Sequence, residues 1–180
     1  MSTLTATPGQ TIGPFFGYAL PFERGNELVP PGAPGAIRLH GVVTDGAGAP
    51  VPDALVESWQ ADPAGEFGGG GFRGFGRSGT DEEGRWAILT LKPGPVPGPA
   101  GHDETPQAPH VDVAVFARGL LHRVVTRLYF ADEGQANAAD PVLAGLDAEA
   151  RATLVAARTD DGYELDIHLQ GPHETTFFAV

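Results

Sequence analysis

Apolar and polar residues alternate along six short segments of the chain, and turn signals separate these segments. The segment 111–117 is the most regular, and the segment 37–44 stops at the turn pair Asp45-Gly46. A period of two is typical of a strand with one buried face. Six such strands with frequent turns predict an all-β protein, an antiparallel β-sandwich or barrel. The predicted strands are residues 37–44, 54–59, 86–90, 111–117, 124–130 and 163–169.

One short helix and two long loops complete the predicted fold. Asp147 is a suitable N-cap and an apolar face follows it, so a helix is predicted near residues 147–157. The glycine-rich loop 61–80 and the proline-rich loop 92–109 flank the same strand, and we expect them to meet at one end of the sandwich. Loops of this length are usually functional or disordered. No linker divides the chain, so residues 1–180 are expected to form a single domain.

Composition and charge exclude several classes of protein. The chain has 180 residues and no cysteine, which rules out a disulfide framework, thiol catalysis and a cysteine-ligated zinc site. No apolar stretch approaches the roughly 20 residues of a membrane helix. The N-terminal sequence is not that of a secretory signal, so a cytoplasmic protein is expected. The net charge of -12 repels nucleic acid and anionic membranes.

Local motifs assign no chemistry on their own. None of the six histidines belongs to an H-x-H or H-x-x-x-H pair, so no metal-ligand spacing is present. The run Gly68–Gly71 lacks the strand-turn-helix setting of a phosphate-binding loop. The G-x-S-x-G motif of esterases is absent. The residue patterns alone therefore predict an all-β domain with two long loops.

Eight segments, in order along nearly the whole chain, match motifs of one family. The first is T-P-x-Q-T-x-G-P at the N-terminus, and the second combines G-x-V-x-D with P-x-A-x-V-E-x-W-Q-A. With these motifs the chain resembles the intradiol ring-cleavage dioxygenases, and in particular the iron-free alpha chains of their two-subunit members. The matching segments are residues 7–16, 41–61, 74–77, 91–95, 108–111, 116–119, 126–130 and 166–178.

The family's ferric iron site is degenerate at the matching positions. Its catalytic chains bind iron through two tyrosines and two histidines, but the tyrosine positions fall on Phe67 and Val96 here. The H-x-H pair falls on His110 and Asp112, and Gln107 replaces the arginine that precedes this pair. One imidazole and one carboxylate are too few ligands for ferric iron. The resemblance therefore implies that this chain has no catalytic residue and that a partner subunit holds the iron.

The resemblance also implies substrate-binding residues that serve the partner. Residues 1–20 would form an arm that reaches toward the partner, and Thr11, Gly13 and Pro14 match the positions that line its pocket. Arg127 matches an arginine associated with the substrate, protocatechuate, whose carboxylate a guanidinium can bind. Two other interpretations remain open: an N-terminal turn without ligand contact, and an interface salt bridge for Arg127.

The activity implied by the resemblance belongs to a complex. A homologous iron-bearing beta subunit would pair with this alpha subunit in the αβ repeat unit of a larger oligomer. The complex would cleave protocatechuate with O2 to 3-carboxy-cis,cis-muconate. Two alternatives are a stand-alone small-molecule binding domain with a dioxygenase-like sandwich, and a self-sufficient enzyme with a metal site rebuilt around His110 and Asp112.

Overall fold

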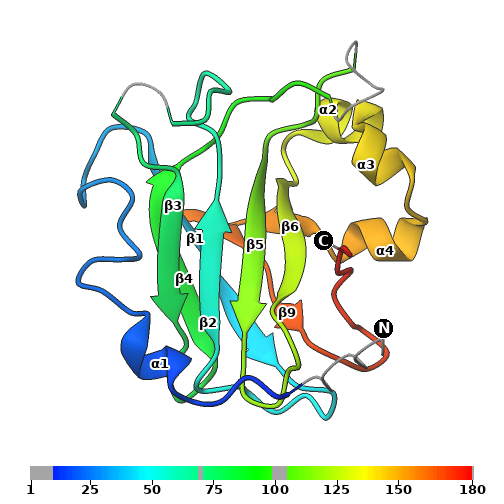
Figure 1. The fold of residues 1–180 in the computed structure, drawn as a ribbon. Coiled ribbons are helices and arrows are strands. Elements are labelled where there is room, and N and C mark those ends of the chain that lie inside the picture. The colour runs from blue at the N-terminus through cyan, green and yellow to red at the C-terminus, as the bar shows by residue number, and fades with distance from the viewer. Residues whose placement is uncertain (1–9, 69–70, 99–104, 180) are drawn as a thin grey trace, which may run out of the picture.

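The computed structural model describes residues 10–68, 71–98 and 105–179, and these residues form mainly β-structure. The strands are β1 (Ala36–Thr44), β2 (Leu55–Trp59), β3 (Phe75–Gly79), β4 (Arg85–Leu91), β5 (His110–Phe116), β6 (Val124–Phe130), β7 (Val155–Arg158), β8 (Gly162–Glu164) and β9 (Ile167–His168). They are ordered β3-β2-β5-β6-β7-β8-β1-β4, with β9 beside β1. This sheet curls into a front layer with β2 and β5 and a rear layer with β1 and β4 (Figure 1). The predicted all-β fold is confirmed.

The front layer has the alternation expected from the sequence. In β5, Val111, Val113 and Val115 are buried, whereas Asp112 and Ala114 lie on the outer face. β5 pairs with β2 on one side and β6 on the other, and both pairings are antiparallel. The outer face of this layer therefore carries the polar residues of the middle strands.

The rear layer contains parallel pairings that were not expected. β1 is antiparallel to β4 but parallel to β8 and β9, and β7 is parallel to β6. The predicted continuous strand 163–169 is wrong, because it is divided into β8 and β9. At the break, the Asp166 carboxylate accepts a hydrogen bond from the Val42 N–H at 2.9 Å. A Cβ on Gly41 would lie 1.9 Å from the Leu165 carbonyl oxygen, so glycine is required there.

Four short helices are present in the described residues, one of them near the predicted place. They are α1 (Phe16–Ala19), α2 (Gly134–Ala139), α3 (Pro141–Ala144) and α4 (Ala148–Ala152). Asp147 caps α4 by accepting from the Ala150 N–H at 2.8 Å, but the predicted extension to residue 157 is wrong. Val155 instead starts β7 opposite Tyr129, because pairing with β6 outweighs local helix propensity. No helix in the described ranges is long and apolar enough to cross a membrane.

The two long loops meet at one end of the molecule, as expected. The Gly94 N–H donates to the Asp62 carbonyl at 2.9 Å, and both loops lie at the top of Figure 1. The predicted loop 61–80 is wrong at its end, because β3 occupies Phe75–Gly79. Four of the five residues of β3 are not typical strand formers, so the sequence pattern did not reveal the strand. In the described part of 92–109 there is no strand, only an isolated bridge.

Two hydrophobic clusters hold the layers together. The larger lies between the two layers and includes Leu39, Ile88 and Leu128. The smaller lies beside β6, where Leu143 of α3 and Leu154 pack with Ala108 and Tyr129. α2, α3 and α4 thus lie beside β6 at the side of the front layer, next to the polar residues described below (Figure 1).

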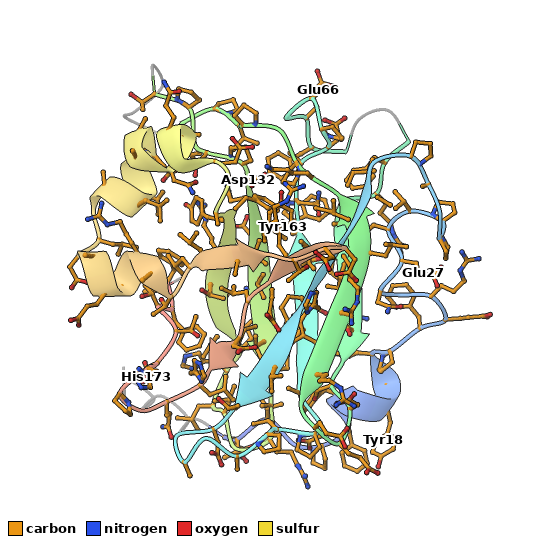
Figure 2. All side chains as sticks on the ribbon, turned by 180° about the vertical axis from the view of Figure 1, so that it is seen from behind. Tyr18, Glu27, Glu66, Asp132, Tyr163 and His173 are labelled. Carbon is orange, nitrogen blue, oxygen red and sulfur yellow. The ribbon has the colours of Figure 1, made fainter. Side chains whose placement is uncertain are left out.

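A charged cluster ties the start of the second long loop to the end of β6. Lys92 Nζ lies 3.0 Å from Asp132 and 2.6 Å from Glu133, and Tyr163 donates to Asp132 at 2.9 Å. Figure 2 shows Asp132 and Tyr163 close together in the view from behind. Burial alone would raise the pKa of Asp132, but hydrogen bonds from Lys92 and Tyr163 lower it. This cluster fixes the base of the loop that contributes Gln107.

Candidate functional site

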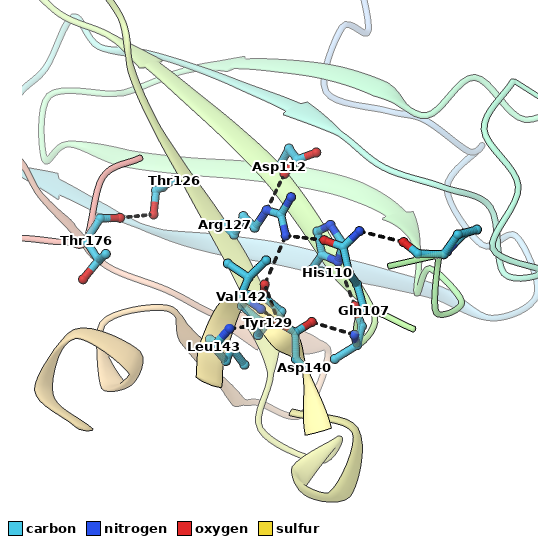
Figure 3. Close-up of polar contacts among 12 residues, drawn as sticks. Gln107, His110, Asp112, Thr126, Arg127, Tyr129, Asp140, Val142, Leu143 and Thr176 are labelled. Atoms are coloured by element: carbon cyan, nitrogen blue, oxygen red, sulfur yellow. Dashed lines mark hydrogen bonds and ion pairs between the residues drawn. The ribbon is translucent and has the colours of Figure 1, made fainter. Parts of the chain in front are cut away.

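The candidate site is centred on Arg127, a partly buried arginine on the outer face of β6. Its Nε donates to Asp112 Oδ1 at 2.9 Å, and its Nη1 donates to Gln107 Oε1 at 2.7 Å and to the Tyr129 hydroxyl at 3.2 Å (Figure 3). Burial alone would lower the pKa of Arg127, but Tyr129 and the carboxylates of Asp112 and Asp140 raise it. The guanidinium is therefore a permanent positive charge in a fixed orientation.

Strand register brings these groups together. Asp112 of β5 lies directly opposite Arg127 of β6, and His110 lies opposite Tyr129. Opposite charges at facing positions of an antiparallel pair attract each other and set the orientation of both side chains. The arrangement follows from the alternation of β5 and β6, which turns Asp112 and Arg127 to the same outer face.

Gln107 connects the guanidinium to the second long loop. Its side-chain Nε2 donates to the Pro97 carbonyl at 2.8 Å, while its Oε1 accepts from Arg127. Its backbone also exchanges hydrogen bonds with Val96, at 2.9 and 3.3 Å. The Gln107 amide is thus held on both sides and presents only its oxygen to the guanidinium.

Asp140 supports the site from beneath. It is fully buried and accepts hydrogen bonds from the backbone N–H groups of Val142, Leu143 and Ala108 at 2.8–2.9 Å. The Tyr129 hydroxyl donates to the same carboxylate at 3.4 Å. Burial raises the pKa of Tyr129 to about 12, so its hydroxyl stays protonated and relays the contact between Asp140 and the guanidinium.

His110 is a buried, neutral part of the same cluster. Its Nδ1 lies 2.7 Å from the Ala108 carbonyl oxygen, and its ring packs 5.5 Å from the Tyr129 ring, centroid to centroid. Burial and the positive charge of Arg127 lower the pKa of His110. A neutral His110 donates through Nδ1 to the carbonyl and stabilises the turn between the loop and β5.

The residues that the motif match places at the iron-ligand positions do not have the chemistry to bind ferric iron. Phe67 stacks on Trp59 with ring centroids 5.9 Å apart and is 48% exposed, while Val96 is buried and apolar. Neither side chain has an oxygen, and Asp112 is engaged with Arg127. In the parts of the chain that the structure describes, no group of three or more His, Cys, Asp or Glu side chains could hold a metal ion.

The N-terminal residues of the predicted site lie apart from Arg127. Thr11, Gly13 and Pro14 are exposed, and the segment is attached by the Ile12 N–H, which donates to the Leu120 carbonyl at 2.5 Å. Pro14 lines a pocket near α1, which lies at the opposite end of the front layer from the two long loops (Figure 1). The chain does not bring these residues to Arg127 in one pocket. Their contact with a partner's substrate stays a prediction.

Arg127 faces an open pocket of about 350 Å³ on the outer face of the front layer. Trp59, Phe75 and Val125 supply apolar surface. Two acidic and two basic residues supply charge: Glu57, Asp112, Arg123 and Arg127. An open surface that combines aromatic and charged side chains is suited to contact with another protein or with a flat ligand.

The sequence analysis singled out Arg127 as a candidate but not Tyr129 and Asp140, which lie in the same hydrogen-bond network. Tyr129 follows Arg127 by two positions on the same strand, a spacing that places both side chains on one side. Asp140 is a recognisable N-cap, because Pro141 follows it at the first helical position. These signals are present in the sequence, but neither indicates contact with Arg127.

Comparisons with known proteins agree with this fold. The family described as Dioxygenase matches residues 12–171. The chain is 43% identical to the protocatechuate 3,4-dioxygenase alpha chain of Burkholderia cepacia, with 100% of both chains covered. It is 35% identical to the beta chain of that species, covering 77% of this chain and 66% of that one. The solved dioxygenase domain of a Streptomyces carbohydrate-binding fusion has 27% identity and a TM-score of 0.60, covering 79% and 84%.

The family model matches most of the chain, and two relatives are more than 40% identical to it over nearly their full length. The chain belongs to the intradiol dioxygenase family.

Proposed function

We propose that this chain is the alpha chain of a protocatechuate 3,4-dioxygenase, a subunit that works only with a homologous iron-bearing beta chain. One observation carries the proposal. The chain is similar over its full length to alpha chains, and the motif match puts Phe67 and Val96, which lack a phenol oxygen, at the tyrosine-ligand positions of the family's catalytic chains. The similarity to a beta chain supports pairing between related subunits in a larger αβ oligomer.

The proposed reaction opens the aromatic ring of protocatechuate. The bond between its two hydroxyl-bearing carbons breaks, each of these carbons gains one atom of O2, and the product is 3-carboxy-cis,cis-muconate. Ferric iron, held by the beta chain, supplies the redox chemistry. This chain contributes the subunit interface, a pocket wall from Thr11, Gly13 and Pro14, and the positive charge of Arg127.

Arg127 is suited to bind the substrate carboxylate. Its Nε and Nη1 are engaged by Asp112, Gln107 and Tyr129, whereas no hydrogen bond is formed by Nη2 within the described residues. The Nη2 N–H groups of a fixed, permanently charged guanidinium form strong hydrogen bonds to carboxylate. We therefore assign the carboxylate to Nη2.

The division of labour is tested by purification. The chain is expressed alone and together with its beta chain, and iron content and protocatechuate cleavage are measured for both preparations. The proposal expects iron and activity only in the pair. Stoichiometric iron or turnover in the lone chain would instead support a metal site rebuilt around His110 and Asp112.

The role of Arg127 is tested by comparing two substrates in the αβ complex. Arg127→Ala should raise KM for protocatechuate by about 10- to 100-fold relative to catechol, which lacks the carboxylate, because a charge-assisted hydrogen bond is lost. Arg123→Ala is the matched control, since Arg123 lines the same pocket. Equal effects of Arg127→Ala on the two substrates would remove the carboxylate assignment and leave an interface role.

A further inference from the structure

The groups around Arg127 include two that the motif match places at or near the family's iron-ligand positions. By that match Asp112 falls at the second position of the H-x-H pair, and Gln107 falls at the arginine that precedes the pair. Each accepts a hydrogen bond from the same guanidinium, at 2.9 and 2.7 Å. Both side chains therefore act as hydrogen-bond acceptors for a guanidinium group.

The contacts around the guanidinium leave it little freedom. Asp112 is held in place by the pairing of β5 with β6, and Gln107 by its hydrogen bond to the Pro97 carbonyl. Tyr129 is buried, and its hydroxyl donates a hydrogen bond to Asp140. A long arginine side chain normally loses considerable rotamer entropy when it is ordered. Here that entropy is lost on folding, before any substrate arrives, which increases affinity for the ligand.

We propose that Gln107 and Asp112 are positioning residues, which hold Arg127 in one orientation so that Nη2 points toward the substrate site of the partner. This inference rests on the proposed function of Arg127. It extends that function to residues that themselves need not touch substrate. Selectivity for carboxylated substrates then depends on Gln107 Oε1, through its hydrogen bond to Arg127 Nη1.

Gln107 permits a test that separates positioning from structural support. Gln107→Leu removes both the oxygen that accepts from Arg127 and the N–H that donates to Pro97. Gln107→Glu keeps an oxygen for Arg127 but loses the donor to Pro97. If only the loop contact mattered, the two variants would behave alike. If positioning matters, only Gln107→Leu disturbs the guanidinium.

The readout is KM for protocatechuate and for catechol, with kcat, in the αβ complex. Gln107→Leu should raise the KM ratio of protocatechuate to catechol by about 5- to 10-fold with little change in kcat. Gln107→Glu should keep the ratio close to that of the wild type. A double-mutant cycle adds a further requirement: in the Arg127→Ala background, Gln107→Leu should leave the ratio unchanged.

The outcomes distinguish this inference from the function on which it rests. A selective effect of Arg127→Ala without one for Gln107→Leu would overturn the positioning role alone. The positioning role also fails if Gln107→Leu and Gln107→Glu raise the ratio equally, or if Gln107→Leu still acts when Arg127 is alanine. A missing selective effect of Arg127→Ala would overturn the carboxylate assignment and the positioning role together.

Discussion

Replacing Asp140 by alanine should destabilise the protein more than an ordinary loss of a helix cap. The carboxylate is fully buried and caps α3 through the N–H groups of Val142 and Leu143. It also accepts from the Ala108 N–H at 2.8 Å and from the Tyr129 hydroxyl at 3.4 Å. One substitution thus removes contacts to a helix, a loop and a strand.

The expected loss follows from these contacts. Removing an N-cap costs about 0.5–2 kcal/mol. Leaving the buried N–H of Ala108 without an acceptor costs about 1–3 kcal/mol more. Asp140→Ala should therefore lower the free energy of unfolding by roughly 2–5 kcal/mol, against the 5–15 kcal/mol typical of a folded domain. For a chain of this length the melting temperature should fall by about 5–20 °C.

Two other variants serve as comparisons in urea unfolding. Asp147→Ala removes the exposed cap of α4, which accepts from the Ala150 N–H at 2.8 Å, and should cost about 1 kcal/mol. Asp140→Asn keeps one oxygen for the cap but turns an amide N–H₂ toward the Ala108 N–H, so its loss should be intermediate. Equal losses for Asp140→Ala and Asp147→Ala would refute the reasoning, because the buried contacts would then contribute nothing.

Two further variants test other parts of the molecule. Lys92→Met removes an ammonium group that helps to lower the pKa of Asp132. The ion pair stabilises the folded protein fully above pH 3.8, the ordinary pKa of the carboxyl group, and this stabilisation is lost as the pH falls through the lowered pKa. The difference in unfolding free energy between Lys92→Met and the wild type should therefore disappear at acid pH, and a difference that stays constant with pH would contradict the role of this ion pair. Gly41→Ala places a Cβ 1.9 Å from the Leu165 carbonyl and should cost about 1–3 kcal/mol or more in urea unfolding. Gly79→Ala, with no heavy atom within 4 Å, should be nearly neutral.

The fold was predictable where local pattern and tertiary pairing agree. Alternation in 111–117 and 124–130 located β5 and β6 closely, because both strands bury one face. It failed for Phe75–Gly79, where glycine contributes no side chain to the pattern. It failed again at Val155, which the pattern places at the end of a helix but which pairs with β6. Contacts distant in sequence decide such segments.

The site was predictable only in part. The match to a family motif singled out Arg127, and the same match marked Gln107 and Asp112 as replaced positions. Their meeting with Arg127 depends on the register of β5 with β6 and on the return of the second loop. Asp140 lies outside every matched motif. No local pattern relates a helix cap to an arginine on a neighbouring strand.

The place of β1 in the sheet affects how the protein folds during translation. One edge of β1 pairs with β4, but the other pairs with β8 and β9, from the last part of the chain. The ribosome releases the N-terminal strands first, so that second edge keeps unpaired N–H and C=O groups until residues 162–168 have emerged. Open strand edges pair readily with other chains. A chain that stops before β8 is therefore an aggregation-prone fragment rather than a smaller folded domain.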